Sequence, residues 1–320
     1  MNRFGAFIVG GALAIALVVT HYRARTDLAR AVESFDGARA FKDLEQLVAL
    51  GPRPPGSPAI ERAREYITAR LGTTAAEVQR DPFTATTPVG RIPMVNIVGV
   101  LSGTSSNVVI VAGHYDTARV KGISFVGAND GGSSAAELLE LGRALSRRRH
   151  VLTCWLVFFD GEEALEQWSH TDSLYGSRHL AEELATDGRL AEVRALILVD
   201  MVAGLQLHIL EKSNSTPWLR DIVIKKARQL GYASSFDGGQ FPVEDDHLPF
   251  AQKGVAAVDI IDLAPFKTYH HTAQDTLDKC SPESLAIVGR VVLAPLEELE
   301  GKFGVDRTGM QQRQGAGGQR

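Results

Sequence analysis

The feature that most constrains the fold is a series of short apolar runs that alternate with helical patterns along the chain. The clearest run, residues 151–159, contains no charged residue, and shorter β-branched runs cover residues 94–101 and 108–112. Strands that are apolar on both faces are typical of a sheet covered by helices on both sides. The alternation therefore predicts an α/β fold, a three-layer α/β/α sandwich around a central sheet.

Periodicity and turn residues place the individual elements. Apolar residues at helical spacing predict helices over 25–50, 58–71, 133–147, 175–184, 217–230 and 282–299. The predicted strands are 94–101, 108–112, 151–159, 195–202, 205–210 and 255–261. A Gly/Ser-rich turn joins the first two strands and predicts an antiparallel hairpin, so the sheet should be mixed. Without a repeat or a domain-splitting linker, residues 30–303 are predicted to form a single catalytic domain.

The two ends of the chain differ in composition from the rest. Residues 4–20 carry no charge and lie between Arg3 and Arg23, which is typical of a signal sequence or a short membrane anchor. We assign residues 1–24 to it; a buried N-terminal helix is the alternative. This predicts an exported or membrane-anchored protein, with its catalytic domain outside the cytoplasm. Residues 304–320, rich in Gly and Gln, are predicted to be disordered.

Charge and cysteine content exclude some classes of protein. The formal net charge of −4 gives no electrostatic reason to expect a nucleic-acid partner. The two cysteines, Cys154 and Cys280, are too few for a disulfide framework. Cys154 lies inside an apolar run, so we expect a buried thiol. A single bridge between the two is the alternative.

Potential metal ligands follow the ends of the predicted strands, where α/β sheets usually place their sites. They are His114, Glu162, Glu163, Asp200 and His271, with Asp130 just before the helix at 133. Because these residues come from distant parts of the chain, their convergence at one edge of the sheet predicts a metal site.

Taken singly, these residues have simpler explanations. Asp130 could favour the dipole of the helix that follows, and Glu162 and Glu163 could form a solvated pair. Asp200 is harder to explain, because a carboxylate ending a buried strand must be paired, hydrogen-bonded or metal-bound. Together the residues favour zinc, whose catalytic sites use three oxygen or imidazole ligands and an open position. One glutamate can then bind the metal and the other act as a base.

Several segments resemble glutaminyl-peptide cyclotransferases, zinc enzymes within the zinc aminopeptidase-like clan. These are Phe-Phe-Asp-Gly-Glu-Glu-Ala at 158–164, residues 168–169 and 172–180, Glu-Asp-Asp-His-Leu-Pro-Phe at 244–250, and residues 114–116 and 127–130. The similarity extends over about residues 38–300. It implies a zinc exopeptidase-like fold and an enzyme that converts the N-terminal glutamine of peptides or proteins to pyroglutamate, with release of ammonia.

The resemblance also implies the ligands and the catalytic group. Asp130, Glu163 and His271 match the three ligands of one zinc ion. Glu162 matches the residue that takes a proton from the α-amine of the substrate and delivers it to the leaving ammonia.

Further residues match the surroundings of that glutamate. Asp200 and Asp245 match two acids of its hydrogen-bond network, and Trp168 and Phe266 match apolar walls of the glutamine pocket. For each aromatic residue a plain core position is the alternative. Family members commonly have a tryptophan before the zinc histidine, whereas this chain has His270.

Two other functions fit parts of the pattern. Zinc aminopeptidases of the same clan bind two ions, and all of their ligand positions are filled here: His114, Asp130, Glu163, Asp200 and His271, with Glu162 as the base. Against this function stand Trp168 and the segment at 173–180, which match the cyclotransferases. A metal-free binding relative should show gaps among the ligands, and none occurs.

Overall fold

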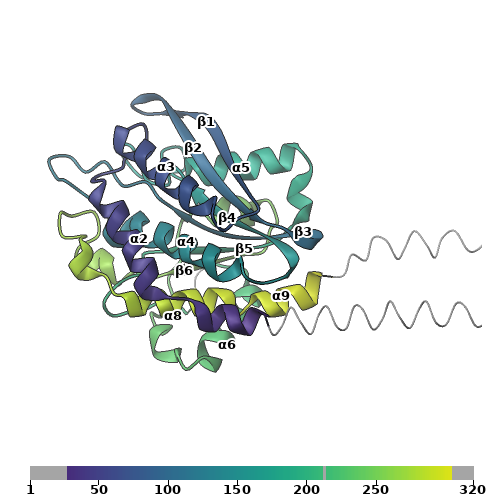
Figure 1. Cartoon of the computed structure of the whole chain (residues 1–320). Helices are drawn as coiled ribbons and strands as arrows, with labels where there is room; N and C mark the ends of the chain where they lie inside the picture. Colours follow the sequence, from purple (N-terminus) through teal and green to yellow (C-terminus); the bar gives the residue numbers. More distant parts are fainter. Residues whose placement is uncertain (1–26, 212–213, 305–320) are drawn as a thin grey trace, which may run out of the picture.

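A mixed sheet of six strands forms the centre of the computed structural model, which describes residues 27–211 and 214–304 (Figure 1). The strands are β1 (Glu77–Thr87), β2 (Gly90–Leu101), β3 (Gly103–His114), β4 (His150–Phe159), β5 (Val193–Asp200) and β6 (Ala257–Ile261), in the order β1-β2-β4-β3-β5-β6. The longer helices are α2 (Gly37–Ala49), α3 (Pro58–Leu71), α4 (Ser133–Leu145), α5 (Tyr175–Thr186), α6 (Pro217–Gln229), α8 (Pro282–Leu293) and α9 (Leu296–Phe303). The short α7 covers Leu248–Gln252.

Helices cover both faces of this sheet, as the apolar runs predict. In β4, Leu156 and Phe158 pack in one core with α2, α3, α4 and α8, while Val157 and Phe159 pack in the other with α5 and α7. Successive strand residues point to opposite faces, so a strand that carries apolar residues on both faces needs both layers. The predicted three-layer α/β arrangement with a mixed sheet is confirmed.

The predicted hairpin of residues 94–112 is wrong. Strand β2 pairs antiparallel with β1 and β4, whereas β3 pairs parallel with β4 and β5, so β4 lies between β2 and β3. The chain passes the end of β4 at Gly103, where a Cβ atom would lie 2.4 Å from the carbonyl carbon of Leu152. Only glycine allows this approach. The sheet is mixed because of the β1–β2 hairpin instead.

Three other predicted elements differ from the structure. The helix at 25–50 is two helices, since Asp36 caps α2 by accepting a hydrogen bond from the backbone N–H of Arg39 (3.1 Å). The helix at 282–299 divides into α8 and α9 at Pro295, which lacks the N–H that a continuous helix needs. Residues 205–210 form no strand; Ile209 makes a single bridge to Asp262.

The remaining predictions concern the cysteines and the chain ends. Cys154 and Cys280 are both buried free thiols, so a bridge between them is ruled out. The predicted anchor at 1–24 and residues 305–320 of the predicted tail lie outside the described residues. Within the described part, no helix has the length and apolar character to cross a membrane. The limits of the single domain, 30–303, stay a prediction.

Candidate metal and catalytic site

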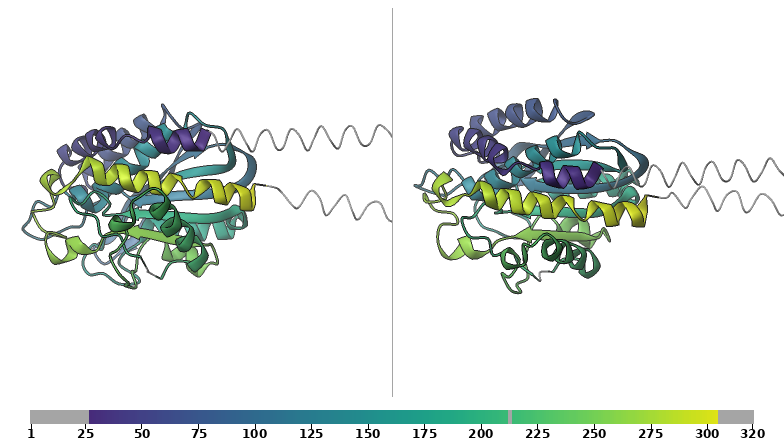
Figure 2. Two further views of the ribbon diagram at one scale, coloured as in Figure 1. Left: turned by 90° about the horizontal axis from the view of Figure 1, so that it is seen from below. Right: turned by 60° about the horizontal axis from the view of Figure 1, so that its bottom comes forward.

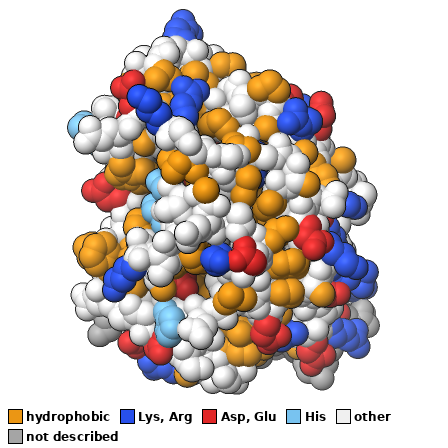
Figure 3. All heavy atoms as spheres, turned by 90° about the vertical axis from the view of Figure 1, so that its left-hand side faces the viewer, with side chains coloured by type: hydrophobic (Ala, Val, Ile, Leu, Met, Phe, Trp, Pro, Cys, Tyr) orange, Lys and Arg blue, Asp and Glu red, His pale blue; other side chains and the backbone are white. Residues whose placement is uncertain are grey.

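Loops at the carboxyl ends of the parallel strands carry the candidate site, on the end of the molecule that faces the viewer in Figure 3. His114 ends β3, Glu162 and Glu163 follow β4, Asp200 ends β5, and His271 lies in the loop after β6. Strands β3 to β6 all run parallel, so their carboxyl ends meet at one edge of the sheet. The convergence predicted from the sequence is therefore found.

The three residues that match zinc ligands meet at the Nε2 atom of His271. This nitrogen lies 2.9 Å from Oε1 of Glu163 and 3.3 Å from Oδ2 of Asp130. Oδ2 of Asp130 is buried and makes no hydrogen bond among the described residues, so its contacts are ion pairs with imidazole nitrogens. A cation between these atoms would satisfy it, and two carboxylates with one imidazole are donors that zinc accepts. The residues present therefore fit a zinc ion.

A second group of metal-binding type adjoins the first and shares Asp130 with it. Nε2 of His114 lies 3.1 Å from Oδ1 of Asp200 and 3.3 Å from Oδ1 of Asp130. His270 also approaches Asp130, with its Nε2 3.5 Å from Oδ2. Sequence reasoning treated His270 only as a departure from a family pattern, and the structure shows that it too can reach a metal held by Asp130.

Glu162 is buried in an acidic environment beside these groups. Burial raises the pKa of Glu162 well above its ordinary value, and the charges of Glu163 and Asp245 raise it further. His114, whose Nδ1 lies 3.8 Å from Oε2 of Glu162, lowers this pKa and so opposes the rise. Burial also raises the pKa of Asp245, and Asp200 contributes to that rise. A carboxylate with a raised pKa is suited to accept a proton and release it again.

Two buried aspartates hold the backbone of the segments that carry the candidate ligands. Asp116 accepts hydrogen bonds from the backbone N–H groups of Glu162 (3.2 Å) and Glu163 (3.3 Å). Asp275 accepts from the N–H groups of Asn129 (2.8 Å) and Asp130 (3.1 Å). Sequence reasoning missed Asp275. Its only signal is its position four residues after His271, in a loop whose path the sequence does not reveal.

The loop that carries Asp130 depends on glycines and on a buried arginine. Gly131 has φ +76°, and a Cβ there would lie 2.3 Å from the carbonyl oxygen of Asp116. The fully buried guanidinium of Arg53 donates to the carbonyl oxygens of Val126 (2.8 Å) and Gly127 (3.2 Å). These contacts fix the chain immediately before Asp130, although the sequence marks Arg53 only as part of a helix-breaking segment.

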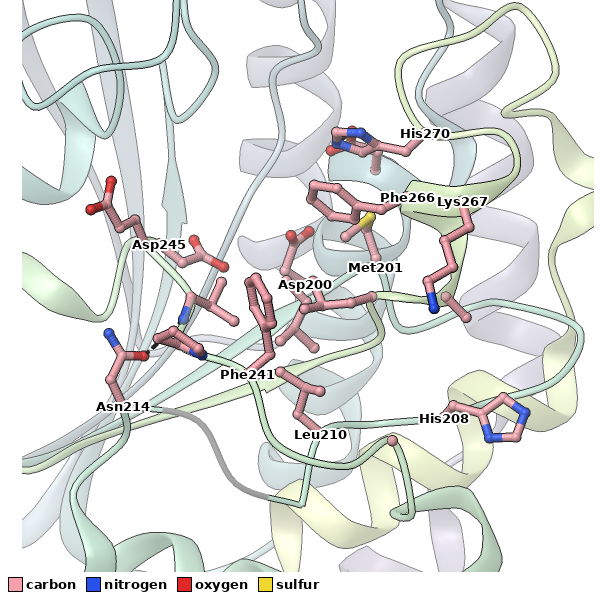
Figure 4. A pocket seen from close by; sticks show the side chains of 18 of the residues that line it. Asp200, Met201, His208, Leu210, Asn214, Phe241, Asp245, Phe266, Lys267 and His270 are labelled. Atoms are coloured by element: carbon pink, nitrogen blue, oxygen red, sulfur yellow. Dashed lines mark hydrogen bonds and ion pairs between the residues drawn. The ribbon is translucent and has the colours of Figure 1, made fainter.

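A cavity of about 1230 Å³ opens from the candidate ligands (Figure 4). Trp168 and Phe266 both line it and are 39% and 55% exposed, so neither is a core residue. The ring of Phe266 stacks on His270 with 3.8 Å between ring centroids, and His270 stacks on His271 at 3.7 Å. The ring of His271, the residue that matches a zinc ligand, is therefore continuous with the aromatic wall of the cavity.

Comparisons with known proteins agree with this description. Residues 96–296 match peptidase family M28. The chain is 33% identical over 279 residues to the glutaminyl-peptide cyclotransferase-like protein of Bos taurus, covering 78% of this chain and 72% of that protein. It is 30% identical over 271 residues to the glutaminyl-peptide cyclotransferase of Drosophila melanogaster, covering 76% of each.

Solved structures give the same result for the fold. The crystal structure of an Acidobacteriales bacterium glutaminyl cyclase is 40% identical, with a TM-score of 0.80, and covers 84% of this chain and 96% of that one. The glutaminyl cyclase of Porphyromonas gingivalis is 27% identical with a TM-score of 0.75, covering 83% and 99%. A Zn-dependent exopeptidase from Parabacteroides distasonis, 24% identical, shares the fold with a TM-score of 0.74 and coverages of 82% and 98%. The predicted zinc exopeptidase-like fold is confirmed.

Proposed function

Because this chain belongs to the glutaminyl-peptide cyclotransferases within peptidase family M28, we propose that it converts the N-terminal glutamine of peptides or proteins to pyroglutamate, releasing ammonia. The observation that carries the proposal is that a buried glutamate, Glu162, lines the same peptide-sized cavity as a group of zinc-type ligands. The substrate is therefore a peptide or protein N-terminus.

Asp130, Glu163 and His271 would hold the zinc ion. When bound, zinc supplies Lewis-acid polarisation of the γ-carboxamide of the substrate glutamine. Trp168 and Phe266 line the cavity beside these ligands and would hold the methylene groups of that glutamine between them. Ring closure is intramolecular, so fixing one side-chain rotamer accounts for much of the rate enhancement.

Glu162 would carry the proton. The α-amine nitrogen forms a bond to the γ-carboxamide carbon, Glu162 accepts a proton from that nitrogen, and the same proton goes to the departing nitrogen as its bond to carbon breaks. The products are pyroglutamate and ammonia, and Glu162 returns to its starting state. Its raised pKa, caused by burial and opposed by His114, suits this exchange. Asp200 and Asp245 support it as neighbouring acids.

The first test uses the purified full chain loaded with zinc and two peptides that differ only in an N-terminal glutamine or leucine. We expect ammonia and the loss of one NH3 in mass from the glutamine peptide alone. Glu162→Gln should abolish the reaction but still bind zinc, whereas the matched control Glu166→Gln, an exposed glutamate on the same loop, should leave the rate unchanged. An active Glu162→Gln protein would refute the assigned role.

The group formed by His114, Asp130 and Asp200 supports a second candidate function, that of a dinuclear zinc aminopeptidase. This enzyme would release free leucine from the leucine peptide and would bind two zinc ions per chain. Zinc content and leucine release, measured on the same preparation, distinguish the two functions.

We also infer export, on the strength of the uncharged segment at residues 4–20. Expressed in a bacterium with a C-terminal tag, the full chain should fractionate with the membrane or the exported proteins. A chain that starts at residue 27 should remain in the cytoplasmic fraction. Equal distribution of the two chains would refute the inference.

A further inference from the structure

Exposed aromatic side chains gather at the cavity. The large exposed hydrophobic residues of the described part are Val89, Ile123, Trp168, Leu205, Phe241 and Phe266. The three aromatic members, Trp168, Phe241 and Phe266, all line the cavity that contains the candidate ligands. An aromatic ring that stays exposed does not contribute the favourable free energy of its burial to folding. The gathering of three such rings at one cavity therefore indicates contact with a ligand. Trp168 and Phe266 already have a role there, whereas Phe241 has none.

The loop that carries Phe241 is fixed at both ends. On one side, the N–H of Gly238 donates to Ile209 (3.0 Å) and the N–H of Glu211 donates to Gly239 (3.0 Å). On the other side, the N–H of Val243 donates to Oδ1 of Asn214 (3.2 Å). The loop therefore presents Phe241 in a set position, and its ring points into the cavity toward Asp200 (Figure 4).

The cavity is too large for a glutamine side chain alone. Its volume of about 1230 Å³ exceeds the roughly 300–1,000 Å³ of pockets that enclose whole drug-sized ligands. Besides the candidate ligands, its lining includes Phe241 with the apolar residues Leu210, Val243 and Leu263. Because pyroglutamate formation changes only the first residue of the substrate, the rest of this volume is available to the residues that follow it.

We propose that Phe241 forms a subsite for the side chain of the residue that follows the N-terminal glutamine, and that this subsite favours apolar and aromatic side chains. The proposal rests on the proposed cyclisation of N-terminal glutamine. An aromatic wall gains most from another apolar or aromatic surface. An acidic side chain would have to leave water for this apolar surface, so the subsite disfavours an acidic residue at this position.

Steady-state kinetics of the zinc-loaded full chain tests the subsite with three substrates: glutaminamide, Gln-Gly-Ala-amide and Gln-Phe-Ala-amide. The wild type should have a higher kcat/KM for the phenylalanine peptide than for the glycine peptide. Phe241→Ala should lower kcat/KM for the phenylalanine peptide roughly tenfold, mainly through KM, and leave glutaminamide unchanged. Phe241→Leu should recover part of the loss. Leu205→Ala, which shortens a 62% exposed side chain outside this cavity, is the matched control and should match the wild type.

Two results would overturn the subsite. An equal loss on glutaminamide and on the phenylalanine peptide would place Phe241 against the glutamine itself, and an unchanged kcat/KM for the phenylalanine peptide would mean no contact. Failure of the proposed function looks different, because the wild type would then release ammonia from none of the three substrates.

Discussion

Asp275→Asn should weaken zinc binding although Asp275 is not among the candidate ligands. Its carboxylate accepts the backbone N–H groups of Asn129 (2.8 Å) and Asp130 (3.1 Å), and its side chain is buried. Asparagine has the same shape but only one acceptor oxygen, so one N–H would face an amide NH2 group. The segment that carries Asp130 would then lose one of the two hydrogen bonds that it donates to the Asp275 carboxylate.

The magnitude follows from these two bonds. A buried N–H left without its acceptor costs about 1–3 kcal/mol. Loss of a partner that orients a metal ligand typically lowers metal affinity about 10–100-fold, which equals about 1.4–2.7 kcal/mol. The two ranges overlap, so we expect the dissociation constant for zinc to rise by about 10–100-fold while the metal-free protein still folds.

Competition with a chromogenic zinc chelator measures the change directly, and thermal unfolding of the metal-free protein shows whether the fold survives. Asp278→Asn is the matched control: it removes the same charge three residues later, from an exposed side chain bonded to Thr276 and Lys279. It should bind zinc as the wild type does. If Asp275→Asn bound zinc as tightly as Asp278→Asn, the reasoning that the carboxylate positions Asp130 would be refuted.

Two further predictions concern stability and pH. Glu137 is fully buried with neither carboxylate oxygen hydrogen-bonded within the described part, and burial raises its pKa, with the charge of Glu140 adding to the rise. The folded state thus keeps a proton that the unfolded state releases above about pH 4.5. The free energy of unfolding of Glu137→Gln, measured with urea, should therefore exceed that of the wild type by about 1–3 kcal/mol at pH 8 and by little at pH 4. An equal or lower stability of the variant at pH 8 contradicts this. Burial lowers the pKa of His150 to about 4, and its Nε2 bonds the carbonyl oxygen of Leu145 at 3.0 Å. Neutral His150 therefore contributes about 3 kcal/mol to the free energy of unfolding above pH 6.5, and this contribution is lost as the pH falls toward 4. The free energy of unfolding of His150→Gln should change less between pH 7 and 4.5 than that of the wild type.

Local patterns predicted the elements whose limits are set locally. Helix α3 begins and ends where its sequence indicates, because Ser57 caps its first turn and accepts from the N–H of Ile60 (3.2 Å). The strand at 151–159 is also correct to within one residue, since its apolar run has no other stable environment. Such signals lie within a few residues of the element that they define.

Strand order was not predictable in the same way. Residues 94–101 and 108–112 are neighbours in sequence, and a hairpin is the usual connection. Pairing with β4, which starts almost 40 residues later, competes with that hairpin and prevails because it places a doubly apolar strand at the centre of the sheet. Gly103 was the available signal, but a glycine in a turn has the same appearance.

The candidate site shows a similar division. The residues that follow strand ends come together as predicted, because strand direction alone determines where they lie; their roles as ligands and base stay a prediction. His270, Asp275 and Phe241 became apparent only in the structure. All three lie in irregular loops, where the backbone path is set by contacts such as the bond from Gly238 to Ile209 and not by periodicity.

The first and last described residues lie together at the end of the sheet where its parallel strands begin (Figures 1 and 2). The cavity is lined by loops at the opposite, carboxyl ends of these strands. Helix 27–34 and α9 share one core, through Leu28 and Leu299 among others, and the side-chain amide of Asn107 in β3 donates to the carbonyl oxygen of Phe303 (2.7 Å). Attachment to a resin or a sensor surface through either end would therefore leave the mouth of the cavity turned toward solution.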